Sequence, residues 1–138
     1  MKKNGFTLIE LLGVLIVLSV LALITIPIAT NVLQKSEKTA FENSTKGILR
    51  TIKNNADESN YEAKIYIMTD GILTTTDSEG NTVTLKTNGG GDENGSFSVD
   101  EDGIIKGSVH DGYWCAKKLK NKEKLQITEY LEHTCYVD

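Results

Sequence analysis

The feature that most constrains this chain is an uncharged apolar run near its start. From Leu11 to Ala29 the sequence reads LLGVLIVLSVLALITIPIA, which is 19 residues without an acidic or basic side chain. About 20 apolar residues in a helix span the hydrocarbon core of a bilayer. Lys2 and Lys3 precede the run, and the positive-inside tendency places this flank in the cytoplasm. The run therefore predicts one membrane-spanning helix with the rest of the chain outside.

One charged side chain, Glu10, stands at the start of this run. A carboxylate costs about 2.5–3.5 kcal/mol at the centre of a bilayer on insertion scales. It needs a partner, and the apolar run that follows supplies none. A secretory signal would have a shorter apolar core and small residues at a cleavage site, which Ala29-Thr30-Asn31 does not provide. A plain membrane anchor is an alternative, but it explains neither Glu10 nor the residues before it.

The first ten residues, MKKNG followed by FTLIE, resemble the processing site of type IV prepilins and their pseudopilin relatives. In that family a membrane peptidase cuts after the glycine of a short basic leader, and the same enzyme methylates the new N-terminus. The resemblance implies that Gly5 ends the leader, that Phe6 becomes the methylated first residue, and that Glu10 is the family's acidic residue. It also puts Pro27 where many pilins carry a helix-bending proline. The resemblance covers roughly residues 1 to 55.

The spacing of apolar residues predicts an α+β fold that begins with one long helix, from residue 6 to about 56. Its first half, 6–29, is apolar all round, as expected of a membrane or filament-core helix. Its second half, 30–56, is amphipathic, and polar residues 54–60 predict its end. The apolar stripe expected to pack against the head consists of Val32, Leu33, Ala40, Phe41, Ile48, Leu49, Ile52 and Ala56.

Residues 57–138 are predicted to form a small extracellular head, because apolar and polar residues alternate there as in a half-buried antiparallel sheet. The expected strands span 63–69, 72–76, 82–87, 96–99, 104–109 and 113–117. Segments 77–81 and 101–103 read as hairpin turns, and the glycine-rich segment 88–95 as a flexible, exposed loop. Because so short a segment has a marginal core of its own, the head is expected to use the helix as one wall.

The two cysteines, Cys115 and Cys135, suit one disulfide in an exported protein better than a metal site. The bridge would close a loop of about 21 residues, for which chain-entropy estimates give about 3 kcal/mol. Many pilins have such a disulfide in their C-terminal region, so the two cysteines add to the resemblance to that family. Two reduced, buried cysteines are the alternative.

No convincing catalytic constellation is found, and we expect no enzymatic activity, no metal and no cofactor. His110 and His133 are isolated, and together with the cysteines they lack the spacing of a zinc module. Asp100–Gly103 resembles the start of a calcium loop, but the position of the closing glutamate is occupied by Asp111. Calcium binding therefore remains a weaker alternative to a solvated turn.

Charge is uneven along the head. From residue 70 to 111 there are nine acids and two lysines, whereas from 117 to 124 there are five lysines and one acid. These stretches form either two solvated faces or complementary contacts between neighbouring subunits. No aromatic-rich basic groove is evident, so sequence-specific nucleic-acid binding is not expected.

The resemblance implies a structural subunit of a type IV pilus that serves adhesion, motility or DNA uptake. In the family the new amino group, here on Phe6, pairs with the glutamate of an adjacent subunit, here Glu10. The implied partners are identical subunits, the prepilin peptidase and methylase, an assembly platform protein, cytoplasmic ATPases and, before assembly, membrane lipid. The precursor would span the cytoplasmic membrane with its N-terminus inside, and the mature chain would join a surface filament. The alternatives are a pseudopilin of a competence or type II secretion system and, less favoured, a membrane-anchored binding protein.

Overall fold

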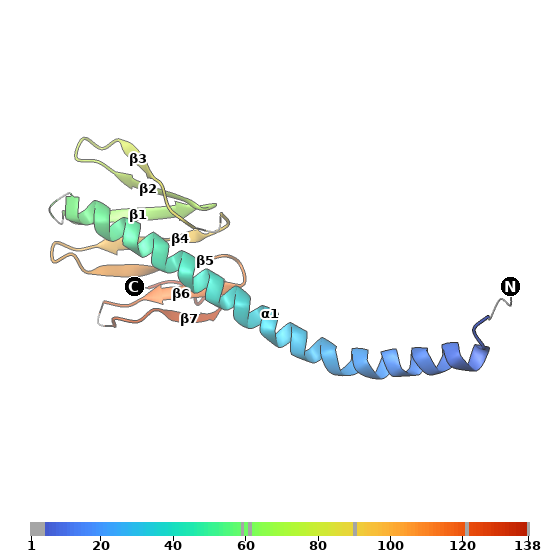
Figure 1. Cartoon of the computed structure of the whole chain (residues 1–138). Helices are drawn as coiled ribbons and strands as arrows, with labels where there is room; N and C mark the ends of the chain where they lie inside the picture. Colours follow the sequence, from blue (N-terminus) through green and yellow to red (C-terminus); the bar gives the residue numbers. More distant parts are fainter. Residues whose placement is uncertain (1–4, 59, 61, 90, 121, 138) are drawn as a thin grey trace. The chain divides into compact units, whose positions relative to one another are not determined.

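A computed structural model describes residues 5–58, 60, 62–89, 91–120 and 122–137. By their contacts the residues form two compact units, Met1–Glu37 and Lys38–Asp138. Lys2 and Lys3, which were expected to belong to a leader, lie outside the described residues. Among those described, a single helix precedes seven strands (Figure 1): α1 (Leu8–Glu58), β1 (Lys64–Thr69), β2 (Ile72–Thr76), β3 (Thr82–Leu85), β4 (Asn94–Val99), β5 (Ile105–His110), β6 (Trp114–Lys118) and β7 (Gln126–Glu129).

The strands form one antiparallel sheet in the order β3-β2-β1-β4-β5-β6-β7. Most connections are hairpins between neighbours, but the chain crosses from the edge strand β3 back to β4, beside β1. This arrangement confirms the predicted α+β fold. The sequence interpretation missed β7, because that strand offers a single aliphatic residue, Ile127. The strand forms because it pairs with β6, where Ile127 lies opposite Ala116.

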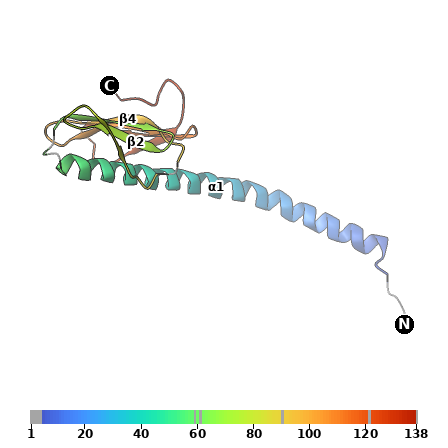
Figure 2. The same ribbon diagram turned by 90° about the horizontal axis from the view of Figure 1, so that it is seen from above.

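The core of the second unit lies between the sheet and the last turns of α1, which cover one face of the sheet (Figure 2). The helix contributes buried residues at a spacing of three and four, as expected of a helix with one packed face: Phe41, Thr45, Ile48, Ile52 and Ala56. The sheet contributes Tyr66, Met68, Leu73, Phe97, Val99, Val109 and Ala116.

The predicted helix stripe is correct only in its second half. Val32, Leu33 and Ala40 are exposed, so the packed face begins at Phe41. Thr45 was not predicted to be buried, yet its side chain is fully enclosed. Its hydroxyl donates to the carbonyl oxygen of Phe41 at 2.9 Å. Because this bond stays within the helix, the hydroxyl can be buried without an unsatisfied polar group.

The structure confirms the predicted end of the helix and corrects the predicted exposed loop. The helix ends at Glu58, within the polar residues 54–60 that were expected to end it, and Asn55 there accepts a hydrogen bond from the hydroxyl of Tyr66 at 3.0 Å. Glu93, in the predicted exposed loop, is buried, and residues 94 and 95 already belong to β4. Ser59 and Gly90 lie outside the described residues.

Glu93 is buried because its hydrogen bonds connect the segment between β3 and β4 to α1 and to the β1–β2 turn. Its carboxylate accepts hydrogen bonds from the hydroxyl of Ser44 on α1 and from the amide of Gly91, the latter at 2.9 Å. Its carbonyl oxygen accepts from the amide of Gly71 at 3.0 Å. Gly71 has a φ of +75°, and a Cβ there would lie 2.5 Å from the Cα of Gly91. The β1–β2 turn can therefore pack this closely against the segment between β3 and β4 only if residue 71 is glycine.

The C-terminal segment is fixed to the sheet face away from α1 (Figure 2). Cys115 of β6 is bonded to Cys135, with 5.7 Å between the Cα atoms. The hydroxyl of Ser108 donates to the carbonyl oxygen of Cys135 at 3.1 Å. The predicted disulfide is confirmed, and the alternatives of reduced cysteines and a zinc site with cysteine ligands are removed.

Removing the disulfide should destabilise the head. In the double variant Cys115→Ser, Cys135→Ser, we expect the free energy of unfolding to fall by about 3 kcal/mol, because the unfolded chain regains the entropy of an open loop. Denaturant unfolding of the full chain in detergent, followed by the fluorescence of Trp114, measures the change. The variant Ser78→Ala, in an exposed turn, serves as the control. Coincident unfolding curves for wild type and the double variant would contradict the expectation.

Candidate functional site

The N-terminus of α1 is closed by a reciprocal pair of side chains. The backbone amide of Thr7 donates to Oε2 of Glu10 at 2.9 Å, and the hydroxyl of Thr7 donates to the same oxygen at 2.9 Å. The amide of Glu10 in turn donates to the hydroxyl oxygen of Thr7 at 3.3 Å. This is a capping box, in which a residue before the helix and one three positions later satisfy each other's free amides.

The capping box revises the sequence interpretation of Glu10. We expected the carboxylate to lack any partner in the apolar run, and the structure gives it one just before that run. The signal was present in the sequence as threonine followed three residues later by glutamate, and it was missed. Both bonds from Thr7 reach Oε2. Among the described residues no bond to the other carboxylate oxygen, Oε1, is found, so Oε1 can receive a donor from outside this helix turn.

The first unit presents apolar side chains around its whole circumference. None of the apolar stretch of α1 that is long enough to cross a membrane is buried within the described protein. Phe6 and Leu8 are the most exposed, at 89% and 87%. The other large apolar side chains exposed here are Ile9, Leu11, Leu12, Val14, Leu15, Ile16, Val17, Leu18, Val20, Leu21, Leu23, Ile24, Ile26, Ile28, Val32 and Leu33. Such a surface suits lipid or other apolar helices rather than water.

Polar groups inside this apolar stretch are satisfied within the helix itself. The hydroxyl of Ser19 donates to the carbonyl oxygen of Leu15 at 2.7 Å, and that of Thr25 donates to the carbonyl oxygen of Leu21 at 3.1 Å. Because a bilayer interior offers no water, hydroxyls there must find partners in the protein. These bonds let the helix enter an apolar environment without leaving those hydroxyls unpaired.

Pro27 lies within α1 and has no amide hydrogen to donate to the carbonyl four residues earlier, that of Leu23. The hydroxyl of Thr30 donates to the carbonyl oxygen of Pro27 at 3.1 Å. The helix is continuous from Leu8 to Glu58. A bend at Pro27 therefore remains a prediction.

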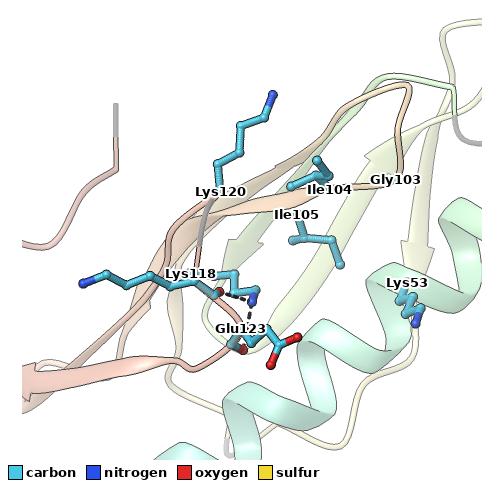
Figure 3. Close-up of a pocket in the computed structure, with 8 residues that line it drawn as sticks. Lys53, Gly103, Ile104, Ile105, Lys118, Lys120 and Glu123 are labelled. Carbon is cyan, nitrogen blue, oxygen red and sulfur yellow. Dashed lines mark hydrogen bonds between the residues drawn. The ribbon is translucent and has the colours of Figure 1, made fainter.

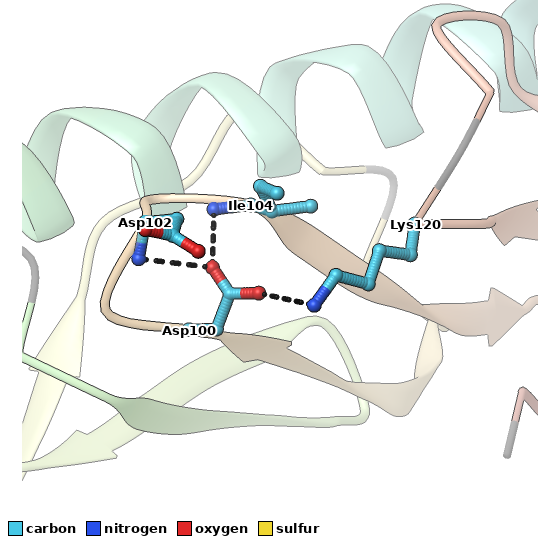
Figure 4. Close-up of polar contacts among 4 residues, drawn as sticks. All are labelled: Asp100, Asp102, Ile104 and Lys120. Carbon is cyan, nitrogen blue, oxygen red and sulfur yellow. Dashed lines mark hydrogen bonds and ion pairs between the residues drawn. The ribbon is translucent and has the colours of Figure 1, made fainter.

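In the head, the turn after β4 uses its acidic residues for local structure (Figure 4). Oδ1 of Asp100 accepts from the amides of Asp102 and Ile104, at 3.2 and 2.9 Å. Oδ2 forms an ion pair with Nζ of Lys120 at 3.0 Å. The carboxylate that would begin a calcium loop is thus bonded to its own chain. Among the described residues no group of three acidic, histidine or cysteine side chains could hold a metal ion.

The Asp100–Lys120 pair predicts a change of stability in acid. The hydrogen bond from Lys120 and those from the backbone hold the pKa of Asp100 below its ordinary value of 3.8. A lowered pKa stabilises the fold above pH 3.8, and this contribution is lost as the pH falls through the folded-state pKa. We expect Asp100→Asn to flatten the dependence of stability on pH below about pH 4. Unfolding curves of the full chain from pH 2 to 7 measure it, with Glu101→Gln as control, and an unchanged slope would contradict it.

The two histidines do not meet. His110 of β5 stacks on the ring of Tyr130, with 4.0 Å between ring centroids, and its buried Nδ1 has no hydrogen-bond partner among the residues that the structure describes. His133 is exposed after β7. His110 lies opposite Cys115 in the register of β5 and β6, but the sulfur of Cys115 is bonded to Cys135. The described residues therefore form no zinc site from the histidines and cysteines considered in the sequence.

Comparison with known proteins agrees with the N-terminal geometry. Residues 1–26 match the family model described as the prokaryotic N-terminal methylation motif. No curated protein and no solved structure matches the chain. The match confirms an N-terminal motif that is typical of type IV pilins and pseudopilins. The motif implies processing by a prepilin peptidase and suggests a membrane precursor.

Proposed function

We propose that this chain is a structural subunit of a type IV pilus, which polymerises through its N-terminal helix into a surface filament. The observation that supports this most directly is the apolar first unit, whose side chains are exposed on every side and which begins in a methylation motif. Such a helix is stable in lipid before assembly and against equivalent helices afterwards. Repetition of one contact between different surfaces gives an open helical polymer.

Glu10 would guide the helix from lipid into the filament. Cleavage after Gly5 leaves a positively charged amino group on Phe6. Oε1 of Glu10, which the capping box does not use, would accept a hydrogen bond from the amino group of the adjacent subunit. The charge of the amine would thereby be compensated as both groups leave water, which offsets part of their desolvation. Pro27 would let the helix bend during packing.

The segments then have separate roles. We propose that residues 1–5 are the leader removed by the peptidase and that 6–29 form the membrane and filament-core helix. Residues 30–56 would carry the head, 57–138, on the outside of the filament, where it makes contacts for adhesion, motility or DNA uptake. An assembly platform protein and cytoplasmic ATPases would drive polymerisation. The run LITIP at 23–27 also resembles competence pseudopilins, so a pseudopilin of a competence or type II secretion system is the second candidate.

Electron microscopy of cells that produce the chain, with immunogold labelling of the head, tests the proposal. A pilus subunit should label long surface filaments along their length. A pseudopilin should give label that stays at the envelope. A protein that is found only as single molecules in the membrane would exclude both functions.

Cleavage itself can be tested at Gly5. We expect Gly5→Leu to block processing, because the peptidase of this family acts after glycine. The intact mass of the protein from membranes should then retain the five leader residues. Gly13→Leu is the matched control, since a Cβ at Gly13 meets nothing within 4 Å and this glycine lies beyond the motif's cleavage point. Mature protein from Gly5→Leu would contradict the assignment.

A further inference from the structure

The head carries a basic groove of about 520 Å³ beside the β6–β7 connection (Figure 3). Lys53 lines it from α1, and two half-buried isoleucines line it, one just before β5 and one as the first residue of β5. Among the described residues, the groove is lined by Lys53, Gly103, Ile104, Ile105, Lys118, Lys120, Lys122 and Glu123. Four lysines and one glutamate thus line the groove, in a head whose net charge is otherwise acidic.

The positive charge of the groove is only partly compensated. Nζ of Lys118 donates to the carbonyl oxygens of Lys122 and Glu123, at 2.5 and 2.9 Å. These bonds fix the ammonium group, but neutral carbonyls do not cancel its charge. Lys120 is paired with Asp100. Ile104 and Ile105 add half-buried apolar surface to one side of the groove.

An acidic hairpin turn lies at the other edge of the same sheet. Residues 77–81 connect β2 to β3 and carry Asp77 and Glu79. Oδ1 of Asp77 accepts from the amides of Asn81 and Glu79, at 2.7 and 3.0 Å. These bonds, that from Asn81 first, lower the pKa of Asp77 below 3.8, so it stays ionised. They also fix the turn in one shape, which reduces the entropy lost when it binds.

The turn and the groove lie at the same end of the sheet but cannot meet within one chain. In an antiparallel sheet β2 and β6 run in the same direction, so the turn after β2 and the connection after β6 leave the same end. Four strand spacings separate β2 from β6, which is about 19 Å. Two complementary surfaces at opposite edges are therefore available to two different molecules.

Other acidic side chains of the head are less suited to the groove. Asp100 already pairs with Lys120 of its own chain. Glu93 is buried. The turn combines two acidic residues at a narrow exposed tip, and it lies far from the groove's own positive charge.

We propose that the basic groove of one subunit receives the acidic turn 77–81 of a second copy of this chain. The contact joins two different surfaces, so its repetition in one direction extends a polymer rather than closing a dimer. It rests on the proposed polymerisation and gives it a second contact, between heads, in addition to that between helices. Because the contact is electrostatic, it weakens as salt rises.

Zero-length crosslinking of assembled mature chains tests the contact. A carbodiimide joins carboxylates to lysines that touch, without a spacer. Filaments assembled from a mixture of ¹⁵N-labelled and unlabelled chains distinguish links between chains from links within one chain. We expect links between chains from Asp77 or Glu79 to Lys53, Lys118 or Lys122. The Asp100–Lys120 pair should give a link within one chain, which serves as the internal standard.

Charge reversal supplies the matched comparison. In Lys122→Glu the remaining links between turn and groove should fall by about tenfold relative to the standard, because like charges then meet. Lys86→Glu, the same change on an exposed lysine after β3, should leave them unchanged. Equal yields in both variants, or groove lysines that link to other carboxylates, would overturn the contact. Sedimentation of each sample separates this result from failure of polymerisation, in which no polymer pellets although the standard link still forms.

Discussion

Glu10→Gln should leave the precursor inserted and cleaved, yet abolish most filament assembly. Glutamine can still accept the bond from the Thr7 amide, so the capping box is kept. The charge is lost, and the amino group of the neighbouring Phe6 would then enter the filament without a counter-ion. Breaking one partner of a buried ion pair costs about 3–5 kcal/mol, which corresponds to a loss of about two to four powers of ten in the assembly constant.

The measurement is the ratio of sheared filaments to membrane-bound subunit, by immunoblot. Thr7→Val is the matched control, because it removes the hydroxyl of the cap but keeps the carboxylate. Loss of a helix cap costs about 1 kcal/mol, so this variant should lose far less assembly than Glu10→Gln. If both variants assemble equally, the role of Glu10 is that of a cap alone and the proposed charge pair is wrong.

Phe97→Ala should be the most destabilising single change in the head. Phe97 is 1% exposed in the core between the sheet and α1. Removing its ring leaves a cavity that the surrounding strands cannot close, which costs about 3–5 kcal/mol. Denaturant unfolding of the full chain in detergent, followed by Trp114 fluorescence, measures the loss.

Ile67→Ala is the control for this substitution. Ile67 lies on β1 and is 51% exposed, so its truncation removes little buried contact and should change stability by about 0.5 kcal/mol or less. Similar losses in the two variants would show that the head is not held by the core described above. They would also weaken the assignment of α1 as one wall of that core.

The position of Phe97 shows why its contribution to the stability of the head could not be predicted from the sequence. It lies opposite Gly107 of β5. A Cβ at Gly107 would stand 2.2 Å from the carbonyl oxygen of Ser96 and 2.8 Å from Cδ1 of Phe97. The ring therefore fits only because its cross-strand neighbour has no side chain. The fit of the ring thus depends on the strand register, which places Phe97 of β4 opposite Gly107 of β5.

The methylation motif could be recognised from local sequence, because its residues follow one another in the chain and need no fold. The roles of Gly5, Phe6 and Glu10 within it remain predictions. The capping box could also have been predicted from the sequence, because Thr7 and Glu10 are three residues apart. The basic groove could not, since Lys53 lies far from Lys118 in the sequence and the two are joined only where α1 packs on the sheet.

The sequence by itself determined the apolar helix, the methylation motif and the alternating strands of the head, because each depends on neighbours in the chain and on a period of about two or 3.6 residues. Only the tertiary structure decided where the packed face of α1 begins, that β7 completes the sheet, and that Glu93 is buried. Those features depend on contacts between distant residues. Burial of a polar or weakly patterned segment is favourable only when its partners have already been brought beside it.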